Sequence, residues 1–286
     1  LLMMRQERAE GRGPSSERQP GAPRADLAEE KFLEARRLFL TSDSNNYLKA
    51  LQYLEEALTI RGDYPEALAA WAEIVSMWYG FQLSEDRYEV AYARAQRAIR
   101  LAPELDMGYR AMADVFRHHC DPKTGRCDTE FAKDLIERAL AINPESAENW
   151  YVKGSIYMAV DLGEAVDYLE RAKQLNPNLA RTYFNLAIAH QMIAEKLLRE
   201  AGEDPELLKQ AETLARPHLE QAIASMKLYQ QMVPRSLAGY CALGLIYFNN
   251  GMIAEAKEMF LRTLGANPNP DPSQHRWWLM AYYHLT

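Results

Sequence analysis

The chain has 286 residues, 48% of them hydrophobic, and a formal net charge of -7. This apolar content is ample for a continuous core, and the negative charge argues against a general affinity for nucleic acid. Three cysteines in so long a chain are too few for a disulfide scaffold, so packing must hold the fold together. No stretch of the sequence reaches the roughly 20 apolar residues that a membrane span needs.

Residues 1–25 are predicted to form a disordered leader or linker. From residue 5 onward this segment mixes Arg, Glu, Gly, Pro, Ser and Gln with almost no large apolar side chains. Such a composition cannot bury enough surface to offset its ordering entropy. We therefore place a helical domain at residues 26–270 and a separate terminal helix at residues 271–286.

From Asp26 onward, apolar residues recur at three- and four-residue steps, a pattern typical of amphipathic helices. Asp26 is the expected N-cap of the first helix, and a second helix runs from Tyr47 to near Gly62. Further helix pairs follow, and several end before a proline that cannot continue the helix: Pro103, Pro144, Pro177 and Pro268.

Three insertions interrupt the pattern, at residues 76–88, 118–130 and 202–216. In the last of them, Asp204 and Pro205 predict the N-cap and first turn of an extra helix that ends at Arg216. Pro217 can occupy the first turn of a helix without losing a needed N–H group. We therefore expect a new helix to begin there and to extend to about residue 232.

The segment from Leu237 to Pro268 shows the repeating unit most clearly. An aromatic residue, a Leu-Gly pair and a second aromatic form one helix, a turn follows at Asn249-Asn250-Gly251, and Ala256, Phe260 and Thr263 share one face of the next helix. This unit resembles the tetratricopeptide repeat. The resemblance implies an all-α, right-handed α-solenoid, a superhelix of about six helix pairs plus a C-terminal capping helix.

Two positions depart from that family's pattern. Lys153 stands where the family usually has an apolar residue, so we expect it to be exposed or its helix to tilt. His190 stands where an aromatic residue is usual.

The resemblance also implies a concave groove lined by the first helix of every repeat. The groove positions predicted to bind a partner are Arg110, Asp114, Arg117, Tyr151, Arg181, Phe184, Ile188 and Gln191. Arginine beside aromatic residues is the composition of binding hot spots. The alternative is that these are ordinary exposed helix residues engaged in ion pairs, such as Arg110 with Asp114.

The sequence contains no Gly-rich phosphate loop, no nucleophile elbow and no His-Glu-x-x-His pair, so we expect neither an enzyme nor a cofactor. Cys120 and Cys127 flank a predicted turn and could form a disulfide. Free thiols or, with the nearby His118 and His119, a metal site are the alternatives. Cys241 is expected to be packed within a helix.

We predict a non-catalytic scaffold or adaptor that binds a peptide or protein segment, not nucleic acid, in its groove. The alternative is an extracytoplasmic sensory or assembly region of a larger, membrane-anchored bacterial protein, which the opening Leu-Leu-Met-Met and the linker would suit. Cytoplasm and bacterial periplasm both fit. Aromatic residues of the terminal helix, including Trp277, Trp278, Tyr282 and Tyr283, would suit a dimer contact or a following segment.

Overall fold

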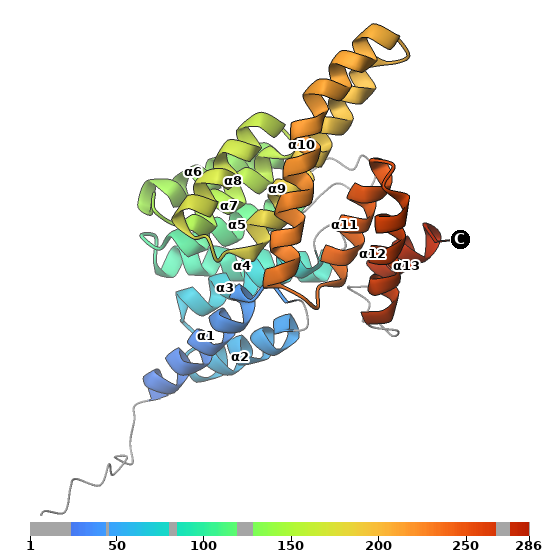
Figure 1. The fold of residues 1–286 in the computed structure, drawn as a ribbon. Helices are drawn as coiled ribbons and strands as arrows, with labels where there is room; N and C mark the ends of the chain where they lie inside the picture. The colour runs from blue at the N-terminus through green and yellow to red at the C-terminus, as the bar shows by residue number, and fades with distance from the viewer. Residues whose placement is uncertain (1–23, 44–45, 80–84, 119–127, 267–274, 286) are drawn as a thin grey trace, which may run out of the picture.

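The computed structural model describes residues 24–43, 46–79, 85–118, 128–266 and 275–285, and within them the chain forms thirteen helices (Figure 1). In chain order these are α1 (Arg24–Leu40), α2 (Tyr47–Ile60), α3 (Pro65–Tyr79), α4 (Glu85–Leu101), α5 (Asp106–His118), α6 (Thr129–Ile142), α7 (Ala147–Tyr157), α8 (Leu162–Leu175), α9 (Ala180–Ala201), α10 (Pro205–Met232), α11 (Leu237–Asn249), α12 (Ile253–Ala266) and α13 (His275–Tyr283). Across these ranges, none of the helices is both long enough and apolar enough to cross a lipid bilayer.

Consecutive helices form six pairs that stack into an all-α solenoid. Each odd-numbered helix from α1 to α11 packs on the helix that follows it, and each pair contacts the next. The terminal helix α13 packs on α11 and α12. The first helices of neighbouring pairs also contact one another, as α3 does with α5. We call the side that these odd-numbered helices line the inner face. The predicted six pairs and final helix are confirmed.

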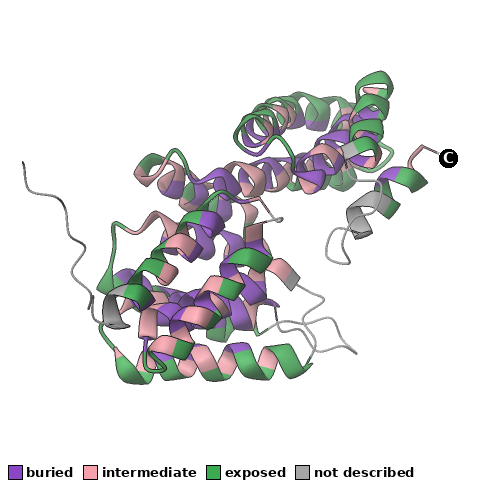
Figure 2. Cartoon of the chain, turned by 90° about the horizontal axis from the view of Figure 1, so that it is seen from below, coloured by how far each residue is buried: buried purple, intermediate pink, exposed green. Residues whose placement is uncertain are grey.

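Small residues allow the two helices of a pair to approach closely. A Cβ atom at Gly154 would lie 2.7 Å from Cγ of Leu169, and one at Gly244 would lie 2.6 Å from the ring of Phe260. Such distances are too short for a methyl group, so glycine is required while the facing side chain keeps its position. Buried residues follow the lines along which helices meet, as Figure 2 shows.

Side-chain caps fix where several helices begin. Ser146, Asp161, Asp204 and Ser236 each accept a hydrogen bond from a backbone N–H in the first turn of α7, α8, α10 and α11 respectively. These bonds satisfy donors that have no partner inside the helix.

The fifth pair is a long hairpin that projects beyond the other helices (Figure 1). Its second helix, α10, runs without interruption from Pro205 to Met232 and contains Pro217. The prediction of two helices divided at Pro217 was wrong. Ala211 and Ala215 on one side of the proline and Ala222 on the other are all buried, and α9 packs along α10. This packing offsets the cost of an internal proline, about 3 kcal/mol.

The expected exposure of Lys153 was also wrong, because its side chain is buried. Its Nζ atom lies 2.7 Å from Oε1 of Glu137 and 4.3 Å from the ring centroid of Tyr168. The methylene groups of a lysine can cover apolar surface while its ammonium group reaches a charged partner. The side chain of Lys153 therefore fills the buried position that an apolar residue occupies in the usual repeat.

Candidate functional site

Five charged side chains meet on the inner face, one from the first helix of each of the first five pairs. They are Arg36 of α1, Glu73 of α3, Arg110 of α5, Glu148 of α7 and Arg181 of α9, and we call them the ion cluster. The sign of the charge alternates from each helix to the next. Arg36 and Glu73 are 37 residues apart, as are Glu73 and Arg110. Successive inner helices therefore contribute opposite charges, from positions that lie progressively closer to the start of the helix from α1 to α7.

Arg36 reaches across the inner face from α1 to α7. Its Nη2 atom donates to both carboxylate oxygens of Glu148, at 2.6 and 2.7 Å. Its Nη1 atom donates to Oε2 of Glu73, at 3.2 Å. The first pair of helices is thereby bonded to the second and the fourth.

Arg110 lies at the centre of the ion cluster and is 1% exposed. Its Nη2 atom lies 3.2 Å from Oε2 of Glu73 and 3.0 Å from Oε2 of Glu148. Its Nη1 atom donates to Oδ1 of Asn149 at 3.1 Å and lies 3.6 Å from Oδ2 of Asp106. Hydrogen bonds on several sides are what make a buried charge tolerable.

The charges of this buried region balance. Three arginines face Glu73, Glu148 and Asp106, so the three positive charges equal the three negative ones. Burial alone would raise the pKa of Glu148, but Arg110, Arg36 and Arg181 outweigh it and lower that pKa to about 2. Glu148 is therefore ionised at any physiological pH.

Arg181 is the least satisfied member of the ion cluster. Its guanidinium lies between two aromatic rings, 4.8 Å from the centroid of Phe39 and 4.6 Å from that of Tyr151. Its Nη2 atom is 3.5 Å from Glu73 and 3.7 Å from Glu148. Neither Nε nor Nη2 has a hydrogen-bond partner among the described residues. Both nitrogens are buried, so the guanidinium is held mainly by the two rings and by its attraction to Glu73 and Glu148.

The predicted groove residues lie on the inner face, but several are buried there rather than exposed. Arg110, Asp114, Tyr151, Arg181 and Gln191 are each less than a tenth exposed. The ordinary ion pair considered between Arg110 and Asp114 is replaced by another, because Oδ1 of Asp114 accepts from Nη2 of Arg117 at 2.7 Å.

The inner face is more open farther along α9. Phe184 and Ile188 are half-buried, and the ring of Phe184 packs edge-on against Tyr229 at 5.1 Å. Between them, Asn185 donates to Oγ of Ser155 at 2.7 Å. One turn beyond Ile188, Gln191 donates to Oε1 of Glu195 at 2.8 Å. Apolar and amide groups here adjoin the unsatisfied guanidinium of Arg181.

Arg36, Glu73 and Glu148 were not among the residues predicted to bind a partner, although Glu73 and Glu148 fall at positions expected to line the groove. The cluster residues stand at different positions along their helices, so no fixed repeat position singles them out. Cys120 and Cys127 lie outside the described residues, whereas Cys241 is buried within α11. In the described part of the chain, no three His, Cys, Asp or Glu side chains gather as metal ligands would.

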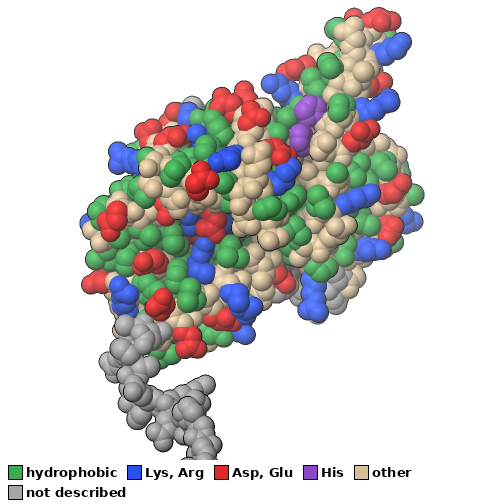
Figure 3. Space-filling model, turned by 60° about the vertical axis from the view of Figure 1, so that its left-hand side comes forward, with side chains coloured by type: hydrophobic (Ala, Val, Ile, Leu, Met, Phe, Trp, Pro, Cys, Tyr) green, Lys and Arg blue, Asp and Glu red, His purple; other side chains and the backbone are tan. Residues whose placement is uncertain are grey.

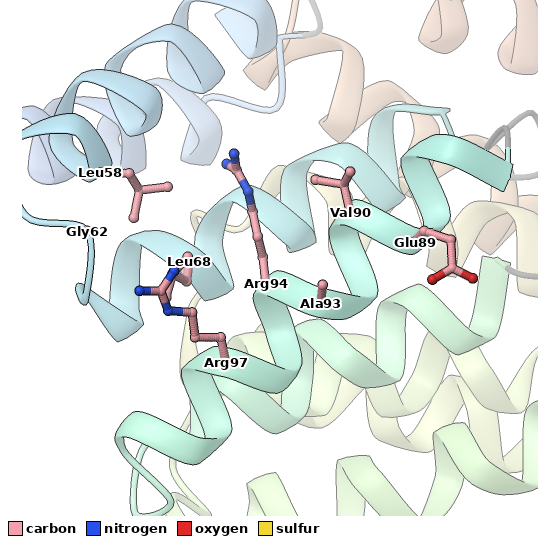
Figure 4. A pocket seen from close by; sticks show the side chains of 8 residues that line it. All are labelled: Leu58, Gly62, Leu68, Glu89, Val90, Ala93, Arg94 and Arg97. Atoms are coloured by element: carbon pink, nitrogen blue, oxygen red, sulfur yellow. The ribbon is translucent and has the colours of Figure 1, made fainter.

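A pocket of about 430 Å³ lies on the outer side of the first two pairs, between α2, α3 and α4 (Figure 4). Leu58, Leu68, Val90 and Ala93 provide its apolar lining, and Arg94 and Arg97 reach across it. Both arginines already have partners, since Arg94 stacks on Trp71 and pairs with Glu55 while Arg97 pairs with Asp63. Acidic and basic side chains are also interspersed across the face in Figure 3.

Comparison with solved structures shows the same fold in larger proteins. A monomeric mutant of IFIT1 with m7Gppp-AAAA has a TM-score of 0.71 at 17% identity, over 90% of this chain and 58% of that one. The human IFIT1 dimer with m7Gppp-AAAA has a TM-score of 0.69 at 18% identity, and the match covers 90% of this chain and 54% of that one. Cut9 in the APC/C hetero-tetramer Cut9-Hcn1 has a TM-score of 0.57 at 15% identity, and the match covers 92% of this chain and 48% of that one. This chain thus spans about half the length of these proteins. Comparison with curated proteins gives no match.

The stacked helix pairs and their shared inner face define an α-solenoid built from repeats. A model of the tetratricopeptide repeat matches residues 237–270, the segment that carries α11 and α12. The family model matches this segment, and the rest of the described chain continues the same arrangement of stacked helix pairs.

Proposed function

We propose that this protein is a non-catalytic interaction scaffold that binds a peptide or protein segment along the inner face of α7, α9 and α11. A solenoid offers its partner an extended surface. Two of the structures with this fold include a partner in their descriptions, Hcn1 with Cut9 and m7Gppp-AAAA with IFIT1. A role as a scaffold is the general function that the fold supports.

The observation that carries the proposal is the change of surface along α9. The buried guanidinium of Arg181 lies at one end, and Phe184 and Ile188 present half-buried apolar surface over the next two turns. The partner segment should therefore place apolar side chains against Phe184 and Ile188, with an acidic group toward the positive charge of Arg181. Asn185 would hydrogen-bond its backbone, because an amide side chain can donate and accept at once. Tyr151 packs on Arg181 directly, and Arg110 shares the carboxylates of Glu73 and Glu148 with it.

The test should spare the ion cluster. Arg181 is 6% exposed, so reversing its charge would disturb the fold as well as binding. Ile188→Glu is better, since this position is half-buried and the new carboxylate would repel an acidic segment. Leu261→Glu is the matched control, because Leu261 is 53% exposed on α12.

The experiment is selection of peptides from a random display library, followed by titration of the enriched peptides by fluorescence anisotropy. We expect peptides with acidic and apolar residues, bound at least about tenfold more weakly by Ile188→Glu and normally by Leu261→Glu. Equal binding by both variants would refute the site. A single-stranded RNA titrated in parallel tests the other ligand class. Tight RNA binding without peptide binding would overturn the proposal.

A further inference from the structure

The long helix α10 presents a stripe without charge on its outward side. Starting at Leu207, positions at alternating three- and four-residue steps are all exposed. None of them is charged: Leu207, Gln210, Leu214, Pro217, Gln221, Ala224, Leu228 and Gln231. We call these eight residues the α10 stripe. Its spacing is that of the seam along which two helices pack in a coiled coil.

The absence of charge is specific to this side of the hairpin. The exposed residues over the last turns of α9 include Glu195, Lys196, Arg199 and Glu200. In the α10 stripe, the three leucines are 45 to 59% exposed. A solvated helix face normally carries charged residues, as α9 does here, so the α10 stripe is better explained as a contact surface.

We propose that two copies of this chain associate through their α10 stripes, with the two helices antiparallel. The helix has 28 residues and is therefore about 42 Å long, which gives room for several layers of contact. A two-fold axis perpendicular to the helix brings the α10 stripe of one copy against the α10 stripe of the other. Because the hairpin projects from the stacked pairs, the antiparallel arrangement keeps the two bodies at opposite ends (Figure 1).

One register of this arrangement pairs six of the eight stripe residues with one another, leaves Leu228 and Gln231 beyond the overlap, and brings opposite charges together. When Leu207 faces Ala224 of the second copy, Leu214 faces Pro217, so each of these large side chains meets a smaller one. Glu206 then lies beside Lys227 of the second copy, and the symmetry repeats this pair of opposite charges. The inner face is left free, so this association is independent of the proposed peptide site.

The first test is sedimentation equilibrium of the purified protein from about 1 to about 100 μM, where mass action should populate a dimer. The variant Leu207→Glu/Leu214→Glu should be monomeric with unchanged helical content. Leu48→Glu/Leu261→Glu is the matched control, because these leucines are 59% and 53% exposed on α2 and α12. It should keep the dimer. A wild-type protein that stays monomeric overturns the proposal, as does a dimer that survives the α10 variant.

A charge exchange tests the antiparallel register. Glu206→Lys and Lys227→Glu should each raise the dimer Kd by roughly 3- to 10-fold, because each places like charges together. The double variant should recover most of the wild-type affinity, whereas additive losses would refute the pairing. Tyr283→Glu on α13, where Tyr283 is 77% exposed, tests the terminal helix. Loss of the dimer in that variant alone would assign the contact to α13 and overturn the proposal.

Discussion

Arg36 and Glu148 are 112 residues apart in sequence, yet two hydrogen bonds of 2.6 and 2.7 Å join them. The bonds run from the first helix pair to the fourth across the inner face. Both side chains are mostly buried, at 13% and 16% exposure. A solenoid whose interior is bridged in this way does not have an empty channel at this level. Its accessible inner surface lies instead along α9, next to the cluster.

Removing Arg36 should destabilise the fold. Arg36→Ala leaves Glu148 and Glu73 with fewer partners in a buried site, which we expect to cost about 3 kcal/mol. The next residue provides the control, because Arg37 pairs with Glu34 while 66% exposed, and such surface pairs contribute little. Urea unfolding followed by circular dichroism measures both. Equal losses for the two alanine variants would mean that the ion cluster does not stabilise the fold.

Acid should weaken the fold through Glu148. Its pKa is lowered from 4.5 to about 2 in the folded state, so the folded protein holds this proton less tightly than the unfolded chain. Glu148 therefore contributes about 3 kcal/mol to the free energy of unfolding. This contribution is fully present above pH 4.5 and is lost as the pH falls through about 2. Glu148→Gln should be less stable at neutral pH and should show a flatter decline in this window. A wild-type slope in the variant would contradict the assignment.

The close approach of α11 and α12 depends on Gly244. A methyl group there would lie 2.6 Å from the ring of Phe260, so Gly244→Ala should lower the free energy of unfolding by about 1 to 3 kcal/mol. Gly265→Ala is the control, since no atom of the described residues outside its own helix backbone lies within 4 Å of the added Cβ, and alanine favours a helix. Thermal unfolding should therefore shift in opposite directions for the two variants. A neutral Gly244→Ala would show that Phe260 can move aside.

The pair His190 and His218 should make stability depend on pH near neutrality. Their Nδ1 atoms lie 3.0 Å apart, so both nitrogens cannot carry a proton in this geometry. Burial and the neighbouring His218 lower the pKa of His190, so the unfolded chain binds this proton more readily than the folded protein does. The fold is therefore unaffected above about pH 6.5 and loses stability as the pH falls below that value. His190→Phe, which restores the aromatic residue usual in the repeat, should reduce the loss of unfolding free energy between about pH 7.5 and about pH 5.5. Chemical unfolding of both proteins at the two pH values measures this loss. A variant that loses as much unfolding free energy as the wild type would refute the role of His190.

The repeats were predictable because their signals are local. Small residues such as Gly154 and Gly244 and the aromatics beside them recur at fixed helical spacing, and spacing alone determines which residues share a helix face. Pro217 was misread because the local preference for a helix start was overridden by packing. Its cost is offset by alanines buried on both sides of it, and no local pattern reveals that α9 extends far enough to cover them.

The inner face was predicted only in part. Spacing correctly grouped Arg110, Tyr151 and Arg181 on one side of the solenoid, but it could not show how tightly the solenoid is wound. Whether such residues meet a partner or one another depends on contacts between segments about a hundred residues apart. Lys153 illustrates the same point, because its burial depends on Glu137 and Tyr168 in neighbouring helices.

The bridge from α1 to α7 also changes how this array should open. In most repeat arrays each unit contacts only its neighbours, so units can fray in turn from either end. Here the ion cluster links α1 to helices of the second and fourth pairs, and the fourth to the third and fifth, so the N-terminal pair cannot separate without breaking contacts far from the end. The first five pairs should therefore unfold cooperatively. The segment α11 to α13, which the ion cluster does not reach, should open at a lower free energy.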